Sequence, residues 1–172
     1  SQLTGMGAAG ILRRTGIQER RWVSDGESSS TLATAAAQAA LEAAGVRPLD
    51  LDGIVVSTTS PDMGMASTAC LVQHNLGLHR IPAFDIAASC SGFLYALSIA
   101  DQYIRTGNAR TFLVMGAGVK SRFLNLRDAS TAILFGDGAG AAVLQATEAD
   151  RGLLSIQLHA DGSRWQLIRL PG

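Results

Sequence analysis

Short strands alternate with helices along most of the chain, and this alternation restricts the fold more than any other feature of the sequence. Three short runs of β-branched and apolar residues have the length of strands: 54–59, 82–87 and 111–116. Three longer segments carry apolar residues at helical spacing: 28–44, 66–76 and 90–106. Strands that alternate with helices favour an α/β fold, a mostly parallel sheet with helices on both faces.

Two more apolar runs, at 141–144 and 153–159, predict strands that close the sheet. Because short turns precede them, we expect some antiparallel pairing, and the whole pattern predicts a mixed, mostly parallel five-stranded sheet. The run Gly-Asp-Gly-Ala-Gly at 136–140 lacks the lysine and the following helix of a phosphate-binding loop. We interpret it as a tight turn whose glycines adopt positive φ angles.

The composition is typical of one soluble globular domain. Of the 172 residues, 47% are hydrophobic and only 16% charged, which argues against disorder. The 14 basic and 14 acidic residues cancel, so nothing in the charge favours nucleic acid or an anionic membrane as a partner. The sequence has no apolar run long enough to span a bilayer and no signal-peptide pattern at its start, so we expect a cytoplasmic protein with free thiols.

Cys90 is the first candidate for chemistry. It lies between the predicted strand 82–87 and the helix that follows, where unpaired backbone N–H groups and the helix dipole stabilise a thiolate. Cysteines in such places act as nucleophiles, and ligands in α/β sheets gather at the carboxyl ends of strands. The alternative is a small buried hydrophobic residue. We prefer that alternative for Cys70, which lies inside the predicted helix 66–76.

The other polar candidates are weaker. His74, His79 and His159 have no metal-ligand spacing, so no metal site is expected. The paired arginines at 13–14 and 20–21 form either a solvated face or a grip for the phosphates of an acidic carrier or cofactor.

Five segments occur in an order that is specific for one family. They are Arg-Thr-Gly-Ile at 14–17, the strand end at 58–59, Ala-Phe-Asp-Ile-Ala-Ala-Ser-Cys-Ser-Gly-Phe at 83–93, Phe-Gly-Asp-Gly-Ala-Gly-Ala-Ala at 135–142, and Leu-His-Ala-Asp-Gly-Ser at 158–163. Together they closely resemble β-ketoacyl-acyl carrier protein synthase III, the initiating condensing enzyme of type II fatty acid synthesis in the thiolase-like superfamily. The resemblance runs from Gly10 to Gly172. Residues 1–9 are expected to be irregular or a truncated N-terminus.

The resemblance implies that residues 10–172 form the N-terminal half of a five-layer αβαβα fold. Cys90 would take a short acyl group from acyl-CoA and condense it with malonyl-acyl carrier protein, with acyl-CoA as a substrate and no cofactor. Arg14 matches a residue that contacts the coenzyme A nucleotide. Met65 matches a residue of the homodimer interface that reaches the partner's acyl pocket, where a flexible side chain suits longer or branched acyl chains. Thr59 and Phe135 match residues near that pocket.

The chain also departs from the family pattern. The family uses a histidine and an asparagine from its second half to activate the malonyl group, and none of the three histidines here matches that motif. Gly10 stands where the family usually has a tryptophan that stacks on the coenzyme's base. We therefore expect these 172 residues to accept an acyl group without completing condensation, and to associate through helices that the second half would cover.

Three alternative functions remain open at this stage. The first is a related thiolase-like acyltransferase with another acceptor. The second is a non-catalytic partner subunit that uses the Cys90 helix for assembly. A nucleotide-binding module is the third and weakest, because it depends on the glycine run alone.

Overall fold

A four-stranded sheet between two layers of helices forms the body of the protein. The computed structural model describes residues 4–170. The strands are β1 (Gly53–Ser57), β2 (Ala83–Ile86), β3 (Thr111–Val119) and β4 (Asp137–Gln145), in the order β2-β1-β3-β4. β1 pairs in parallel with both β2 and β3, whereas β4 pairs antiparallel with β3. The carboxyl ends of three parallel strands therefore meet at one edge.

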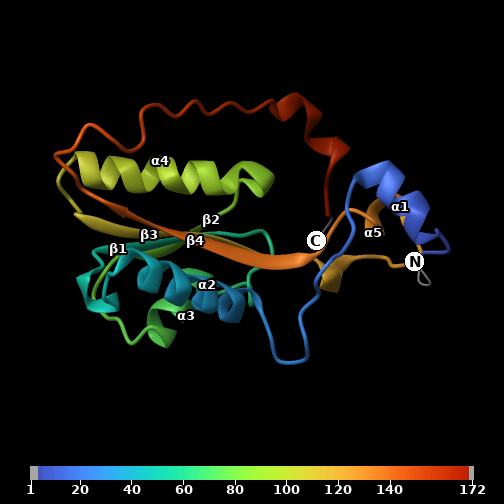
Figure 1. Cartoon of the computed structure of the whole chain (residues 1–172), viewed down its shortest axis with the longest axis horizontal. Coiled ribbons are helices and arrows are strands. Elements are labelled where there is room, and N and C mark those ends of the chain that lie inside the picture. Colours follow the sequence, from blue (N-terminus) through green and yellow to red (C-terminus); the bar gives the residue numbers. More distant parts are fainter. Residues whose placement is uncertain (1–3, 171–172) are drawn as a thin grey trace.

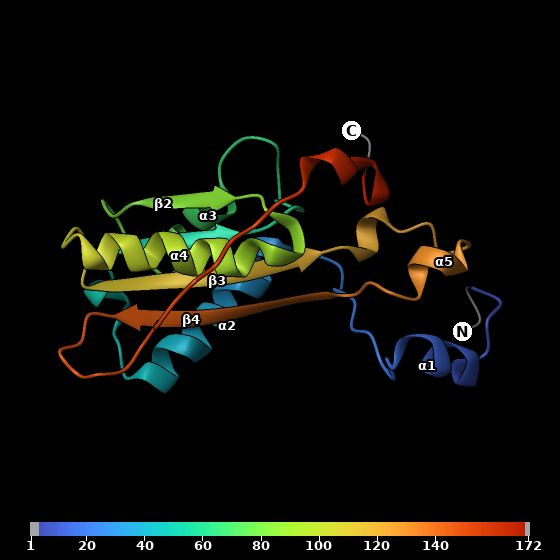
Figure 2. The same cartoon turned by 90° about the horizontal axis from the view of Figure 1, so that it is seen from above.

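Helices cover both faces of this sheet, as the sequence predicts. They are α1 (Ala8–Thr15), α2 (Ser29–Ala44), α3 (Thr68–Asn75), α4 (Gly92–Arg105) and α5 (Ala129–Ala132), with 3₁₀ turns at η1 (Pro48–Asp50), η2 (Ser89–Ser91), η3 (Ser121–Phe123) and η4 (Gly162–Leu167). α2 and α3 lie on one face and α4 on the other, while α1 and α5 lie together beyond one end of the sheet (Figures 1 and 2). No helix within residues 4–170 has the length and apolar character needed to cross a membrane.

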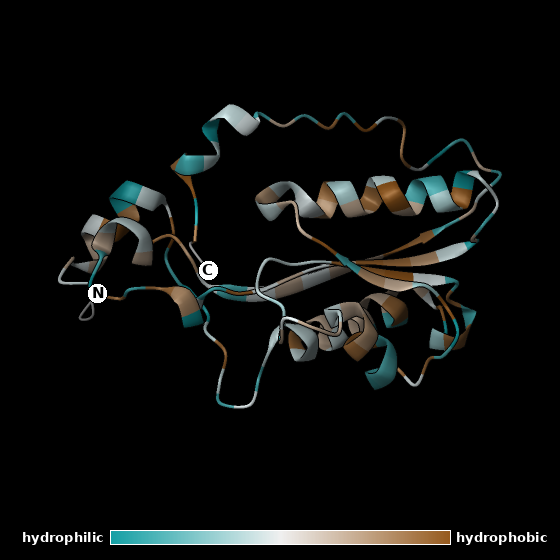
Figure 3. Ribbon diagram, turned by 180° about the vertical axis from the view of Figure 1, so that it is seen from behind, coloured by the Kyte–Doolittle hydropathy of each residue, from teal (hydrophilic) through white to brown (hydrophobic). Residues whose placement is uncertain are grey.

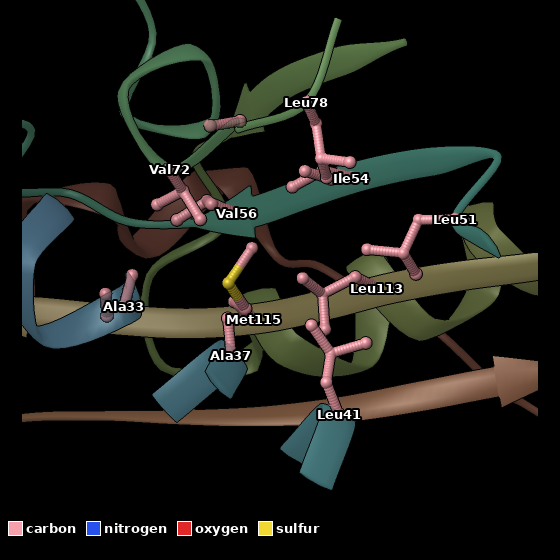
Figure 4. Packing of buried hydrophobic residues seen from close by; sticks show 12 residues of the cluster. Ala33, Ala37, Leu41, Leu51, Ile54, Val56, Val72, Leu78, Leu113 and Met115 are labelled. Carbon is pink, nitrogen blue, oxygen red and sulfur yellow. The ribbon is translucent and has the colours of Figure 1, made fainter. Parts of the chain in front are cut away.

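Each face of the sheet carries its own apolar core. Ile54 and Val56 of β1 pack with α2 and α3, in the cluster that Figure 4 shows, whereas Val55 packs with α4. Alternate residues of a strand point to opposite faces, so a strand buried on both faces is apolar at every position. Alanines of α2 (Ala33 and Ala37) and of α4 are completely buried and let the helices approach the strands closely. Figure 3 shows the apolar residues concentrated in this layered body.

The ends of α2 follow from local chemistry. Ser28 caps the helix and forms a capping box with Thr31. Gly45 ends the helix with a φ of 65°, in the left-handed region that glycine adopts without strain. The carboxylate of Asp62 accepts hydrogen bonds from the hydroxyl groups of Ser28 and Ser30, so the loop after β1 is fastened to the start of α2.

The structure corrects the predicted fifth strand. Residues 153–159 form no strand; they run along the outer side of α4 in both views, away from the sheet edges (Figures 1 and 2). Arg105 of α4 donates a hydrogen bond to the carbonyl oxygen of Leu153, and Leu154 is 87% exposed. An apolar run alone does not make a strand when no strand edge lies beside it to share its backbone hydrogen bonds.

One further prediction was wrong at the level of local structure. The glycine run at 136–140 is not a turn, because Asp137–Gln145 form β4, in which Gly138 and Gly140 lie opposite Gly118 and Gly116 of β3. None of these glycines has a positive φ. In the N-terminal segment expected to be irregular or truncated, α1 begins at Ala8. Residues 1–3 lie outside the described part of the chain, as do residues 171–172.

Candidate active site around Cys90

Cys90 lies in a tight turn between β2 and α4. The chain leaves β2 at Ile86, forms the 3₁₀ turn Ser89–Ser91 and enters α4 at Gly92. Ser89 has a φ of 47°, a left-handed conformation that is uncommon for a residue other than glycine. The thiol-bearing residue is exposed to solvent. The turn thus presents an accessible thiol immediately before the first turn of a 14-residue helix.

The turn is held against the carboxyl ends of the strands. The backbone N–H of Thr58 donates to the carbonyl oxygen of Ile86 over 3.1 Å, which joins the end of β1 to the end of β2. A Cβ added at Gly92 would overlap the Oγ of Ser57, so the start of α4 touches the last residue of β1. The ring of Phe93 lies over Gly116 of β3. These contacts place Cys90 at the edge where α/β proteins bind ligands.

Lys120 is a neighbour of Cys90 that the sequence reasoning missed. It directly follows β3, and its Nζ donates a hydrogen bond to the hydroxyl of Thr59, which follows β1. Burial lowers the pKa of Lys120 below its ordinary value, and the negative charge that Cys90 carries when ionised offsets part of that effect. The lysine itself is visible in the sequence, but its closeness to Cys90 depends on the pairing of β1 with β2 and β3.

Asp137 fastens the loop that carries Lys120. Its carboxylate accepts hydrogen bonds from the backbone N–H of Ser121 at 2.8 Å, from the Ser121 hydroxyl at 2.5 Å, and from the backbone N–H of Val23 at 2.9 Å. Partial burial raises the pKa of Asp137, but the hydrogen bonds from Ser121 and from the backbone N–H groups of Val23 and Lys120 outweigh burial and hold the pKa below its usual value. The end of β3 is also fixed by the loop after β1, because Val119 donates its backbone N–H to the Oγ of Ser60.

Of the remaining predicted residues, the structure links Thr59 to this centre through Lys120. Thr59 is exposed and joined to Lys120, whereas Met65 lies in the loop before α3 with 88% of its surface exposed. Phe135 is half-buried in the loop before β4, and Arg14 is exposed in the last turn of α1. Among residues 4–170, no hydrogen bond or salt bridge joins Arg14, Met65 or Phe135 to the Cys90 turn.

Two cavities surround α1, where Arg14 lies. Arg14 and Gly10 line a shallow one of about 350 Å³ together with Met6 and Arg13. A larger one, of about 510 Å³, lies between α1, α5 and the segment that carries Arg20 and Trp22. Both cavities belong to the part of the molecule beyond the end of the sheet, so any ligand bound to Arg14 and Cys90 together would have to extend between the two regions.

Cys70 is not a core residue, contrary to the prediction. It is exposed on α3, whose buried residues are Thr68, Ala69 and Val72, and its thiol contacts the carbonyl oxygen of Ala83 at 3.6 Å. Apolar neighbours in sequence lie on different faces of a helix, which is why Ala69 is buried and Cys70 is not. The three histidines are exposed, and residues 4–170 contain no group of three or more His, Cys, Asp or Glu side chains arranged for a metal ion.

Two family models match the chain. The thiolase N-terminal domain model matches residues 12–122, which is more than half of the chain. The model of 3-oxoacyl-[acyl-carrier-protein] synthase III matches residues 84–162 and includes Cys90. The two matches overlap over 84–122, the segment that contains the turn, α4 and β3.

Curated relatives and solved structures agree with these models. A β-ketoacyl-[acyl-carrier-protein] synthase III of Xylella fastidiosa is 53% identical over 161 residues, 94% of this chain and 49% of that protein. The synthase III of Novosphingobium aromaticivorans is 51% identical over 168 residues, 94% of this chain and 52% of that protein. A crystal structure of the Aquifex aeolicus synthase III superposes with a TM-score of 0.91 at 43% identity, over 94% of this chain and 52% of that one. The Pseudomonas aeruginosa synthase III structure gives 0.94 at 37% identity, over 99% and 54%.

The chain spans about half the length of the curated relatives that it matches. Within that half, the likeness covers both the sequence and the layered fold, and it confirms the resemblance drawn from the ordered motifs. The chain belongs to the thiolase N-terminal domain family and is a relative of the β-ketoacyl-[acyl-carrier-protein] synthase III enzymes.

Proposed function

We propose that Cys90 is the acyl-accepting nucleophile of a condensing enzyme that initiates fatty acid synthesis. One observation carries this proposal: an exposed thiol lies in a strained strand-to-helix turn, above the carboxyl ends of three parallel strands, inside the segment that matches the synthase III model. Thiolates both attack thioesters and leave them readily, which suits a residue that must accept and then release an acyl group.

In the proposed first step, the Cys90 sulfur attacks the thioester carbon of a short acyl-CoA. A bond forms between this sulfur and the acyl carbon, the bond from the acyl carbon to the coenzyme sulfur breaks, and the coenzyme leaves with the proton that Cys90 gave up. The backbone N–H of Cys90, at the entrance to α4, is our candidate donor to the negative oxygen of the tetrahedral intermediate.

We propose that the second step is condensation with malonyl-acyl carrier protein. The family resemblance implies that a histidine and an asparagine from the second half of the fold activate the malonyl group, and no histidine of these 172 residues matches that role. We therefore expect residues 1–172 alone to form the acyl-enzyme and to stop there.

The remaining sites follow from the same resemblance. We propose that Arg14 binds the nucleotide of coenzyme A, supported by its exposed position in the lining of the smaller cavity. Thr59 and Phe135 are proposed to border the acyl pocket. The exposed loop of Met65 is proposed to reach the acyl pocket of the second subunit in a cytoplasmic homodimer. The outer side of α4, with Leu94 53% exposed, would then face the second half of the five-layer fold.

The test is mass spectrometry of the chain after incubation with acetyl-CoA. We expect one acetyl group on the peptide that contains Cys90, and none on that peptide in C90S. C70S is a matched control, because Cys70 is also an exposed thiol of the same chain, and it should be acetylated at Cys90 as the parent is. Two outcomes would contradict the proposal: an acetyl group that persists on the same peptide in C90S, or no acetyl group on Cys90 in correctly folded protein.

A further inference from the structure

Lys120 is the only lysine of the chain, and its position is unusual for a charged residue. It is half-buried, it directly follows β3, and its Nζ is bonded to the hydroxyl of Thr59. Partly burying an ammonium group costs free energy unless an acceptor or an opposite charge compensates it. A hydroxyl group carries no charge, so Thr59 alone compensates the ammonium incompletely.

The contacts of three strand ends bring the segment that carries this ammonium near the Cys90 turn. Ser57 touches Gly92, two residues after Cys90, and Thr59, two residues after Ser57, binds Lys120. Phe93, three residues after Cys90, lies over Gly116 of β3, the strand that leads to Lys120. A negative charge on Cys90 would raise the pKa of Lys120, which agrees with this arrangement.

The charged groups around Lys120 do not neutralise it. The carboxylate of Asp137 is occupied by Ser121 and Val23, and Arg122 donates to the backbone oxygen of Glu27 on the far side of the loop. Within residues 4–170, no carboxylate lies within salt-bridge distance of the Lys120 ammonium. The ammonium is therefore bonded to Thr59 and lies near Cys90 without a carboxylate to neutralise it.

Acylation changes what this cation faces. Before the reaction, an ionised Cys90 can act as its counter-ion; afterwards the sulfur belongs to a neutral thioester. An acyl chain that ends in a methyl group leaves the ammonium with the Thr59 hydroxyl only. An acyl chain that ends in a carboxylate supplies a new counter-ion and a charge-assisted hydrogen bond.

We infer that Lys120 is a specificity-determining residue, which makes Cys90 accept acyl groups with a carboxylate at the far end, such as succinyl, in preference to wholly apolar acyl groups of similar length. This inference rests on the proposed function, because it requires that Cys90 be acylated. The acyl transfer is balanced as described above, and Lys120 takes no part in bond making.

A first experiment tests the cation beside the thiol without any acyl transfer. Iodoacetate and iodoacetamide both alkylate a thiolate with loss of iodide, but only iodoacetate is negatively charged. The ratio of their rates at one pH does not depend on how much of the thiol is ionised. Peptide mass spectrometry resolves Cys90 from Cys70, so Cys70 serves as the internal reference. We expect the ratio to be about fivefold higher at Cys90 than at Cys70, the effect of one nearby charge in water.

Three variants sharpen this measurement. K120M keeps the length of the side chain and should lower the ratio at Cys90 to that of Cys70, whereas K120R should keep it. R110M removes one positive charge just before β3, about 30 Å away along that strand, and should leave the ratio unchanged. Circular dichroism confirms that each variant is folded. A ratio at Cys90 that is the same in K120M and in the parent chain overturns the inference.

The second experiment compares succinyl-CoA with butyryl-CoA as acyl donors to Cys90. We expect the parent chain and K120R to react faster with succinyl-CoA than with butyryl-CoA. In K120M, the ratio of the succinyl rate to the butyryl rate should be about fivefold lower than in the parent chain. Acylation by butyryl-CoA with no preference for succinyl-CoA overturns the inference and leaves the proposed function intact. Acylation by neither donor, together with a Lys120-dependent alkylation ratio, overturns the proposed function and with it the claim of acyl specificity.

Discussion

Gly92 and Ser57 are in direct contact, and the contact has no room for a side chain at position 92. A Cβ added to Gly92 would overlap the Oγ of Ser57 and would lie 3.1 Å from its Cβ. Gly92 is buried at the first position of α4, and Ser57 is buried at the last position of β1. The position of the Cys90 turn therefore depends on the absence of a single methyl group.

G92A is expected to destabilise the fold and displace the turn. Overpacking a close contact costs about 1–3 kcal/mol, and here relief requires α4 to move away from β1. Chemical denaturation measures the loss of stability, and the rate of Cys90 alkylation by iodoacetamide reports the displacement. In an S57A background the Oγ is absent, so G92A should cost clearly less there. G138A, on the open side of β4, is the matched control and should have little effect; equal costs for G92A and G138A would contradict the argument.

Ser89 stores strain next to the candidate nucleophile. Its φ of 47° is tolerated by a small side chain, but a β-branched residue is strongly disfavoured in that region. S89V is therefore expected to lower the free energy of unfolding by about 1–3 kcal/mol. S91V, two residues later at a φ of −86°, introduces the same side chain without the strain. Thermal unfolding compares the two variants, and S89V should melt at the lower temperature. Equal melting temperatures would contradict the claim that Ser89 is strained.

The sequence predicted the strands where local chemistry decides them. β1 is a run of β-branched residues buried on both faces, and its pattern is unambiguous. β3 was predicted to end at Gly116, but it continues to Val119 through Gly116-Ala117-Gly118, residues with little strand preference of their own. Pairing with the glycines of β4 extends this strand, and such pairing is not visible in either segment alone.

The candidate site was predictable only for the residue that carries the motif. Cys90 was identified from its place between a strand and a helix, which is local information. Lys120 was missed because it comes near Cys90 through the parallel pairing of β1 with β2 and β3, whose order no local pattern gives. The outward position of Cys70 depends on the exact rotation of α3, whose apolar pattern is weak.

R14A tests the proposed contact with the nucleotide of coenzyme A. Loss of a charged hydrogen bond to phosphate is expected to raise the concentration of acetyl-CoA needed for half-maximal acylation of Cys90 about tenfold. Acetyl-pantetheine has the same thioester without the nucleotide, so its reaction with R14A should match that of the parent chain. R13A changes the neighbouring exposed arginine of α1 and serves as the control. If R14A slowed both donors equally, the arginine would act on the fold rather than on the nucleotide.

The carboxylate of Asp137 is expected to make the free energy of unfolding depend on pH in acid. Its folded-state pKa lies below the ordinary value of 3.8, because the hydrogen bonds from Ser121 and from the backbone N–H groups of Val23 and Lys120 outweigh burial. A carboxylate with a lowered pKa stabilises the fold fully above the unfolded pKa, and this contribution is lost as the pH falls through the folded pKa. D137N turns an amide N–H₂ toward these donors and should cost about 1–3 kcal/mol near neutral pH. Because the variant has already lost the carboxylate, the gap between its unfolding free energy and that of the parent chain should narrow below a pH of about 4. D150N, at an exposed position after β4, should stay within about 0.5 kcal/mol of the parent chain, and a gap for D137N that is constant with pH would contradict the role of the charge.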